Sequence, residues 1–306
     1  MLVGVMALTL DEQYAEAVRA AELYGSTWWA LPGNTMAADR LRRFPALRTE
    51  LGRRAEDAEL IPSRDVFDSA LGWDPPRTDL HGQLLGDLAG APDGRGLPPH
   101  LYVTLGMPGS GKTRTLRQVA LRHARTAAGR AVTVAVSDAD AIRERLPEYA
   151  AGRGSEVLQD EVAVLAYGEA SYPAGGGLQQ RILAATPGTA VLVVDVVGDQ
   201  RYLPATVVSL ADDGWQVFLL QAECPVETCI ERVRRRAVAT GRVVDLAYVR
   251  SAAARPARAL KAAVATGRVA GWAQIDTSGD GPAAARMLAG DDGQTFGPLG
   301  GPVLDR

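Results

Sequence analysis

The chain has 306 residues, of which 47% are hydrophobic and 23% are charged, a composition typical of a folded globular protein with one large or two smaller domains. The net charge of −3 argues against an extended nucleic-acid-binding surface, and the two cysteines are too few for a disulfide framework. Without a basic leader or an apolar run of about 18 residues, the sequence predicts a cytoplasmic protein with no membrane partner.

Residues 1–97 are predicted to form a mostly helical N-terminal region. Apolar spacing favours three helices: one that is capped by Thr9 or Asp11, runs to Leu23 and is ended by Gly25, and two others over residues 36–60 and 79–88. The pair Trp28–Trp29 is more typical of a core or a domain seam than of a ligand platform. The role of the region stays open: it shapes a substrate pocket, binds a protein partner or restrains the activity.

Strands and helices alternate over residues 98–277, after a linker rich in glycine and proline. This alternation predicts an α/β fold of the P-loop kinase type, a doubly wound parallel sheet with helices on both faces. Residues 278–306 show little periodicity, which predicts an irregular tail. The expected strands are 101–105, 131–136, 190–197, 216–222 and 270–275, and the expected helices are 112–127, 140–144, 156–168, 178–185, 203–211, 226–239, 245–253 and 255–265.

Residues 106–113 fit the Walker A pattern G-x-x-x-x-G-K-[ST] at every fixed position, between a β-rich run and a helical run. The backbone N–H groups of such a loop and the following helix N-terminus cradle phosphate. Lys112 would reach the β- and γ-phosphates, and the hydroxyl of Thr113 would bind Mg²⁺. The sequence therefore predicts a site for ATP or GTP with Mg²⁺, formed by Gly106, Gly109, Ser110, Gly111, Lys112 and Thr113.

Carboxylates follow two of the expected strands. Asp195 ends the strand 190–197, where a doubly wound fold places its ligand crevice, so it is a candidate for holding Mg²⁺. Asp138 and Asp140 follow the strand 131–136, where a kinase needs a base to orient and deprotonate the attacking hydroxyl. One or both of them alternatively cap the next helix.

The densest cationic run is Arg232 to Arg236, followed by Gly241 and Arg242. Helical periodicity cannot place all four of these arginines on one buried face, so some of them are solvated. One or two of them are expected to compensate the charge that spreads over a transferred phosphoryl group. Gly241 would let that segment close.

These motifs together resemble the zeta-toxin family of P-loop kinases over roughly residues 80–277. The carrying residues are 106–113, the block from Ser137 to Tyr149, Val193–Asp195 with Gly198, and Ile230–Arg232 with Thr240–Arg242. The resemblance implies ATP- and Mg²⁺-dependent phosphorylation of a small-molecule hydroxyl, in several members on a UDP-N-acetylsugar. It implies Asp140 as the catalytic base, Arg232 and Arg242 on the ATP phosphates, and Lys112 and Thr113 in the roles given above.

The acceptor side departs from the family pattern. Val197 stands where the family usually has threonine, Gln179 or Gln180 stands where it has an acidic sugar contact, and Arg201 is displaced from the usual arginine position. The expected acceptor is therefore a nucleotide sugar, a nucleoside or an antibiotic-like molecule, contacted by Asp138, Gln179, Gln180 and Arg201.

Two other functions fit the same motifs. One is a nucleotide-dependent switch or ATPase module without a small acceptor, and the other is a polynucleotide 5′-kinase, against which the acidic charge balance counts. The family resemblance also suggests a protein partner, such as an antitoxin-like inhibitor, bound through residues 1–97.

Overall fold

A computed structural model describes residues 8–70, 72–89, 99–129, 132, 134–168, 176–185, 191–196, 198–279 and 285–290. The chain divides into two compact units. The helical unit comprises residues 1–88, 139–177 and 231–244, and the sheet unit comprises residues 89–138, 178–230 and 245–306. In the described part of the chain, no helix combines the length and the apolar character that a membrane crossing requires.

The sheet unit contains six strands in the order β2-β3-β1-β4-β5-β6. The first five are parallel and β6 runs antiparallel to β5, so the predicted α/β sheet is confirmed with one antiparallel edge strand. The sequence had predicted an irregular tail where β6 lies. The strands are β1 (His100–Leu105), β2 (Ala135–Ser137), β3 (Val191–Val196), β4 (Gln216–Glu223), β5 (Gly271–Asp276) and β6 (Arg286–Gly290).

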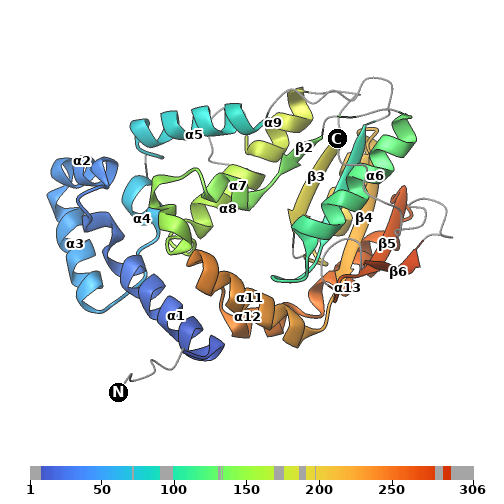
Figure 1. The fold of residues 1–306 in the computed structure, drawn as a ribbon. Coiled ribbons are helices and arrows are strands. Elements are labelled where there is room, and N and C mark those ends of the chain that lie inside the picture. Colours follow the sequence, from blue (N-terminus) through green and yellow to red (C-terminus); the bar gives the residue numbers. More distant parts are fainter. Residues whose placement is uncertain are drawn as a thin grey trace, which may run out of the picture. The chain divides into compact units, whose positions relative to one another are not determined.

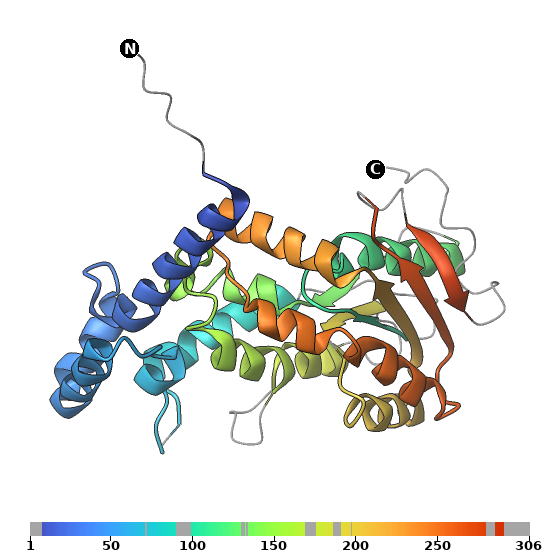
Figure 2. The same ribbon diagram turned by 90° about the horizontal axis from the view of Figure 1, so that it is seen from below.

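Helices cover both faces of this sheet. The single turn η2 (Lys112–Leu116) and helix α6 (Arg117–Ala128) lie over one face, and α10 (Leu203–Asp212) and α13 (Arg255–Val264) lie over the other (Figures 1 and 2). Helices α9 (Leu178–Ala185) and α12 (Leu246–Ala252) complete the described helices that lie wholly in the sheet unit. Two covered faces explain why every residue of β1 is buried.

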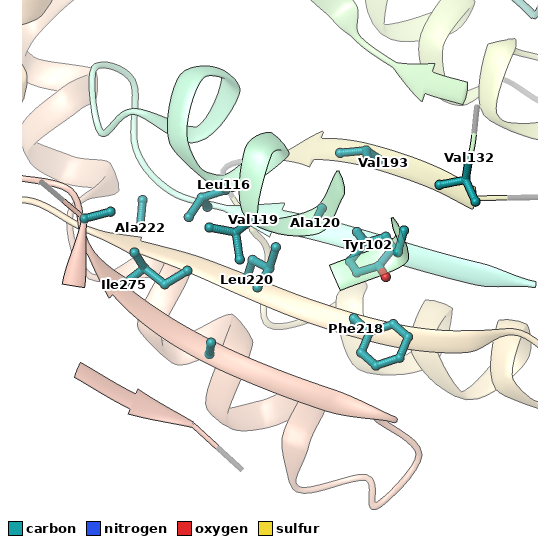
Figure 3. Packing of buried hydrophobic residues seen from close by; sticks show 13 residues of the cluster. Tyr102, Leu116, Val119, Ala120, Val132, Val193, Phe218, Leu220, Ala222 and Ile275 are labelled. Atoms are coloured by element: carbon teal, nitrogen blue, oxygen red, sulfur yellow. The ribbon is translucent and has the colours of Figure 1, made fainter. Parts of the chain in front are cut away.

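The core beneath α6 fixes the position of the loop that follows β1. Leu116, Val119 and Ala120 point from the turn and helix toward Tyr102, Phe218 and Leu220 of the strands (Figure 3). Burial of such side chains contributes roughly 1.5–3 kcal/mol each. Since β1 is the central strand between β3 and β4, the loop at its carboxyl end is held by strands on both sides.

The helical unit gathers the N-terminal helices with two later segments of the chain. Its core includes Trp28 and Trp29, which are buried as predicted, together with Leu51, Phe67 and Val157. The elements are α1 (Leu10–Thr27), η1 (Trp28–Ala30), α2 (Thr35–Arg43), α3 (Pro45–Glu56), α4 (Ser63–Phe67), most of α5 (Pro75–Ala89), α7 (Ala139–Arg143), η3 (Pro147–Gly152), α8 (Gln159–Tyr167) and α11 (Val226–Thr240) from Glu231 onward.

A fully buried ion network joins these segments. The guanidinium of Arg77 binds the carboxylate of Glu148 at 2.8 Å and that of Glu161 at 2.6 Å. The carboxylate of Glu161 also forms a hydrogen bond with the imidazole of His81 and accepts one from the hydroxyl of Ser63, so both of its oxygens are paired. Because buried charges are tolerated only when paired, this network ties α5 to η3 and α8.

Three sequence-predicted boundaries in this unit are wrong. The predicted helix 36–60 is two helices, because Pro45 lacks an N–H and disfavours helical backbone at Phe44. Gly25 does not end the first helix, which continues to Thr27; a Cβ at Gly25 would lie 2.8 Å from Leu60 Cδ1, so this glycine permits close packing. Helix α8 begins at Gln159 rather than at Glu156.

Candidate active site

The phosphate-loop motif lies between β1 and η2, at the carboxyl end of the central strand. Gly109 and Gly111 have φ of +80° and +90°, a region that L side chains rarely adopt. A Cβ at Gly109 would also lie 2.5 Å from the carbonyl oxygen of Cys229. The spaced glycines of the motif are therefore required by both backbone conformation and packing.

The loop encloses polar groups that suit a phosphate. Ser110 is fully buried, and among the described residues its Oγ has no hydrogen-bond partner. The ammonium of Lys112 donates to the loop carbonyls of Gly106 at 2.6 Å and Met107 at 3.1 Å. A buried unpaired hydroxyl is costly unless a ligand completes its hydrogen bonds, so the loop fits an anion.

The two residues predicted to hold Mg²⁺ both belong to the sheet unit. Thr113 follows Lys112 in η2 and is exposed. Asp195 pairs with Thr104 in the β1–β3 ladder, so its backbone lies beside the central strand, one residue before the loop-facing end. The side chain of Asp195 lies outside what the structure describes. Hydroxyl and carboxylate oxygens are suitable ligands for Mg²⁺.

Asp138 has a partner within the sheet unit. Its carboxylate accepts an ion-paired hydrogen bond from Arg117 of α6 at 2.7 Å. The pair joins the segment after β2 to the helix after the phosphate loop. This arrangement favours a structural role for Asp138, one of the alternatives that the sequence left open.

Asp140 lies in the first turn of α7 in the helical unit, and both of its carboxylate oxygens are held by arginines. Arg143 of the same helix donates to Oδ1 at 2.5 Å, and Arg242 donates to Oδ2. Arg143 is itself fixed by Gln159 at 2.7 Å. Burial raises the pKa of Asp140, but the hydrogen bond and charge of Arg242, with the charge of Arg143, lower it further, so its net pKa lies below the ordinary value. Asp140 is therefore ionised at neutral pH.

Arg236 adds a third cation to this cluster. Burial and the charge of Arg242 lower the pKa of Arg236 to about 10, and within the described residues its Nε has no hydrogen-bond partner. Three guanidinium groups therefore surround one carboxylate, which leaves an excess of positive charge. Such a partly desolvated excess attracts an anion. Arg232 lies one helical turn earlier on α11 and is half-buried.

The residues predicted for the acceptor fall on two elements of the sheet unit. Gln179 and Gln180 lie in the first turn of α9. Arg201 is 73% exposed and ion-paired with Asp199 at 2.7 Å, and this pairing lowers the pKa of Asp199 to about 2. Arg201 lines a polar cavity of about 290 Å³ together with Gly198, Asp199, Gln200, Arg255 and Arg258.

The structure brings together some of the predicted residues and adds others. Asp140 and Arg242 meet in the helical unit, which also contains Arg232, and the Walker A residues meet in the sheet unit. Sequence reasoning missed Arg143 and Arg236 as neighbours of Asp140. Arg143 was detectable from its i,i+3 spacing to Asp140, whereas nothing in the sequence separates Arg236 from the arginines next to it.

Comparison with known proteins identifies the family of the chain and folds that are similar to it. The model of the zeta toxin family matches residues 91–270. A crystal structure of an AvrRxo1-ORF1:-ORF2 complex with ATP is similar in fold, with 15% identity, a TM-score of 0.52, and coverage of 79% of this chain and 80% of that chain. A structure from the PezAT toxin–antitoxin system of Streptococcus pneumoniae has 12% identity, a TM-score of 0.45, and coverage of 74% and 84%. No curated protein sequence matches the chain.

Proposed function

We propose that this chain, which belongs to the zeta toxin family, transfers the γ-phosphoryl group of ATP to a hydroxyl of a small molecule, with Asp140 as the base. The observation that carries the proposal is the ionised carboxylate of Asp140, held at both oxygens by Arg143 and Arg242. Members of P-loop kinase families need such a group because the acceptor hydroxyl must be oriented and lose its proton.

The phosphate loop performs the binding step. Its backbone N–H groups and the hydroxyl of Ser110 donate to phosphate oxygens, and the ammonium of Lys112 exchanges the carbonyls of Gly106 and Met107 for the β- and γ-phosphates. When bound, Mg²⁺ supplies neutralisation of the phosphate charge, and Thr113 and Asp195 are the residues that would hold it. GTP would make the same phosphate contacts, so the loop alone does not discriminate between adenine and guanine nucleotides.

The transfer step uses the cluster around Asp140. The acceptor oxygen forms a bond to the γ-phosphorus as the bond from that phosphorus to the bridging oxygen of ADP breaks, and Asp140 takes the hydroxyl proton. A carboxylate has about four lone-pair positions, so two arginine contacts leave room for that proton. Arg242, Arg236 and Arg232 would stabilise the charge that develops on the phosphoryl oxygens.

The acceptor is a small molecule with a hydroxyl: a nucleotide sugar, a nucleoside or an antibiotic-like compound. Gln179, Gln180 and Arg201 are the proposed contacts, and the cavity of about 290 Å³ beside Arg201 is lined by two further arginines, which favours an acceptor with an acidic or phosphorylated part. Asp138 contributes less to this role because it is bound to Arg117.

An acceptor screen tests the proposal. The protein is incubated with ATP, Mg²⁺ and panels of the three acceptor classes, and mass spectrometry looks for products heavier by one phosphoryl group. The Asp140→Asn variant should bind ATP and lose the product, whereas Asp87→Asn, at a mostly exposed carboxylate of α5, should behave as wild type. ATP hydrolysis that needs no acceptor and survives Asp140→Asn would favour the nucleotide-switch alternative.

A protein partner is the second part of the proposal. The solved relative with a TM-score of 0.52 is a complex of two proteins. For this chain we assign such contacts to residues 1–97, where Leu8, Phe44 and Leu60 expose apolar side chains. Substituting exposed residues of this group with serine should abolish complex formation in pull-downs with the full chain and leave phosphotransfer intact.

A further inference from the structure

A cavity of about 570 Å³ lies within the helical unit and has no part in the proposed phosphotransfer. One wall comes from the second half of α1 and the residues after it, and the other comes from η3 and Arg153. The volume is within the usual range of small-molecule pockets. Its described lining residues are Ala20, Leu23, Tyr24, Thr27, Trp28, Leu31, Gly33, Asn34, Pro147, Ala150 and Arg153.

The polar atoms of the aromatic wall are already used by the protein. The indole N–H of Trp28 donates to the carbonyl of Ile61 at 2.7 Å, and the hydroxyl of Tyr24 donates to the carbonyl of Glu148 at 3.0 Å. The hydroxyl of Thr27 donates to the carbonyl of Leu23 at 2.7 Å. These bonds fix both rings. The Trp28 ring is fully buried behind the wall, so the preorganised aromatic surface that the cavity offers an occupant is the half-buried ring of Tyr24.

The edge of the cavity exposes large apolar side chains. Leu23 is 67% exposed and Leu31 is 42% exposed, on the two sides of the Trp28 turn. Contiguous exposed apolar surface of this kind marks binding sites in soluble proteins. An apolar occupant would remove both leucines from water.

Arg153 is the one charged side chain among the described lining residues. Its guanidinium carbon lies 6.0 Å from the centroid of the Tyr24 ring. Among the described residues, no carboxylate forms an ion pair with Arg153, in contrast to Arg77 and Arg143 in the same unit. An anionic group on the occupant would give this cation a partner, and its ring would stack with the same aromatic wall.

The opposite wall is built from strained backbone. Ala150 and Ala151 have φ of 45° and 54°, a left-handed conformation that alanine rarely adopts. Two contacts hold this conformation. The N–H of Gly154 donates to the backbone carbonyl of Tyr149 at 3.0 Å, and Gly152 packs against the backbone of residues 240–242. Strain maintained by surrounding structure is characteristic of ligand-binding segments. Here it shapes the wall that Ala150 contributes.

We propose that this cavity is a second small-molecule site, specific for a planar aromatic compound that carries one anionic group. Tyr24 contacts the ring, Leu23 and Leu31 cover it, and Arg153 pairs with the anion. The site is separate in function from the phosphate loop, because none of the Walker A residues lines it.

Three naphthalene probes of similar shape test the charge specificity: 2-naphthalenesulfonate, 2-naphthalenemethanol and 2-naphthylmethylammonium. Binding to the full-length protein is measured by calorimetry without nucleotide, in excess inorganic phosphate so that the phosphate loop is saturated. The sulfonate should bind at one site about tenfold more tightly than the ammonium probe. Equal affinities, or binding at many sites, would overturn the proposal.

Variants locate the site. Arg153→Gln should weaken sulfonate binding about tenfold and change binding of the neutral alcohol by less than about twofold, whereas Leu23→Ser should weaken all three probes to a similar degree. Arg48→Gln, at an exposed arginine of α3 that does not line the cavity, is the matched control. Equal sulfonate affinity in the Arg153 and Arg48 variants would show that the cavity does not bind the anion.

Discussion

Arg242 and Asp140 are 102 residues apart in the sequence, and a charged hydrogen bond joins them within the helical unit. Arg143 binds the other carboxylate oxygen, so the side chain of Asp140 is fixed in orientation and in charge. In the proposed role as base, this carboxylate needs no movement before it accepts a proton.

Removal of the charge on Asp140 should therefore affect chemistry more than binding. We expect Asp140→Asn to lower kcat by about 10²–10⁴-fold, the usual contribution of general-base catalysis, with the Kd for ATP changed by less than about threefold. Steady-state kinetics and calorimetry provide the two measurements. A variant with wild-type kcat would remove Asp140 from the base role.

The pH dependence of turnover follows from the lowered pKa of Asp140. A carboxyl whose pKa lies below its ordinary value stays ionised down to acidic pH, so the carboxylate that we propose as the base is ionised throughout the neutral range. We expect the acid limb of the kcat profile to fall below about pH 4 or to be hidden by unfolding. An acid limb near pH 6–7 that disappears in Asp140→Asn would contradict the ion-paired geometry.

We predict that Arg236 lowers the stability of the folded protein and raises its catalytic activity. Its pKa is lowered to about 10, which means that the folded protein disfavours its charged form, so its charge destabilises the fold at every pH below that value. Arg236→Met should raise Tm by about 1–3 °C and lower kcat/KM for ATP-dependent transfer about 10–100-fold. Arg235→Met is the control, because Arg235 is mostly exposed and paired with Glu231 on the same helix. Equal effects of the two substitutions would assign Arg236 no special role.

The buried network around Arg77 should dominate the stability of the helical unit. Arg77→Met leaves Glu148 and Glu161 buried without their cation, which costs about 3–5 kcal/mol in the free energy of unfolding. Arg53→Met, at an exposed arginine paired with Glu50, should change the free energy of unfolding far less, because water screens that pair. Urea unfolding followed by circular dichroism compares them. A loss at Arg77 as small as that at Arg53 would mean that the carboxylates find other partners.

We predict that the buried imidazole of His123 makes the folded protein less stable at mildly acidic pH. Burial, with the charge of nearby His100, lowers its pKa to about 4, and its Nδ1 shares a hydrogen bond of 2.6 Å with the hydroxyl of Tyr102. The unfolded chain takes up this proton near pH 6.5 and the folded protein does so only near pH 4, so stability is complete above pH 6.5 and falls as the pH drops toward 4. His123→Gln should flatten this part of a plot of Tm against pH; an unchanged slope would assign the effect to other groups.

The phosphate loop was predictable because its chemistry is local. The spacing of Gly106, Gly111 and Lys112 fixes both the backbone conformation and the ligand class, and the strand and helix on either side follow from ordinary periodicity. The alternation of elements likewise predicted the parallel sheet. Strand β6 escaped prediction because a short edge strand is selected by its pairing with β5 rather than by a pattern of its own.

The long-range ion pairs were harder to predict. Arg77, Glu148 and Glu161 are charged residues that a sequence pattern assigns to the surface, and only the fold shows that they neutralise one another in the interior. The sequence predicted that arginines near residue 240 would matter but could not rank Arg232, Arg236 and Arg242, because the ranking depends on which of them faces Asp140.

The packing of Gly152 against residues 240–242 constrains how this protein can vary. A Cβ at Gly152 would lie 2.1 Å from the carbonyl oxygen of Thr240, and one at Gly241 would lie 2.8 Å from that of Ala151, so neither position accepts a larger residue without displacing the segment that carries Arg242. Chains that share this junction should therefore be recognisable by a pair of glycines about ninety positions apart. In library selections for folded protein, these two sites should reject every other amino acid.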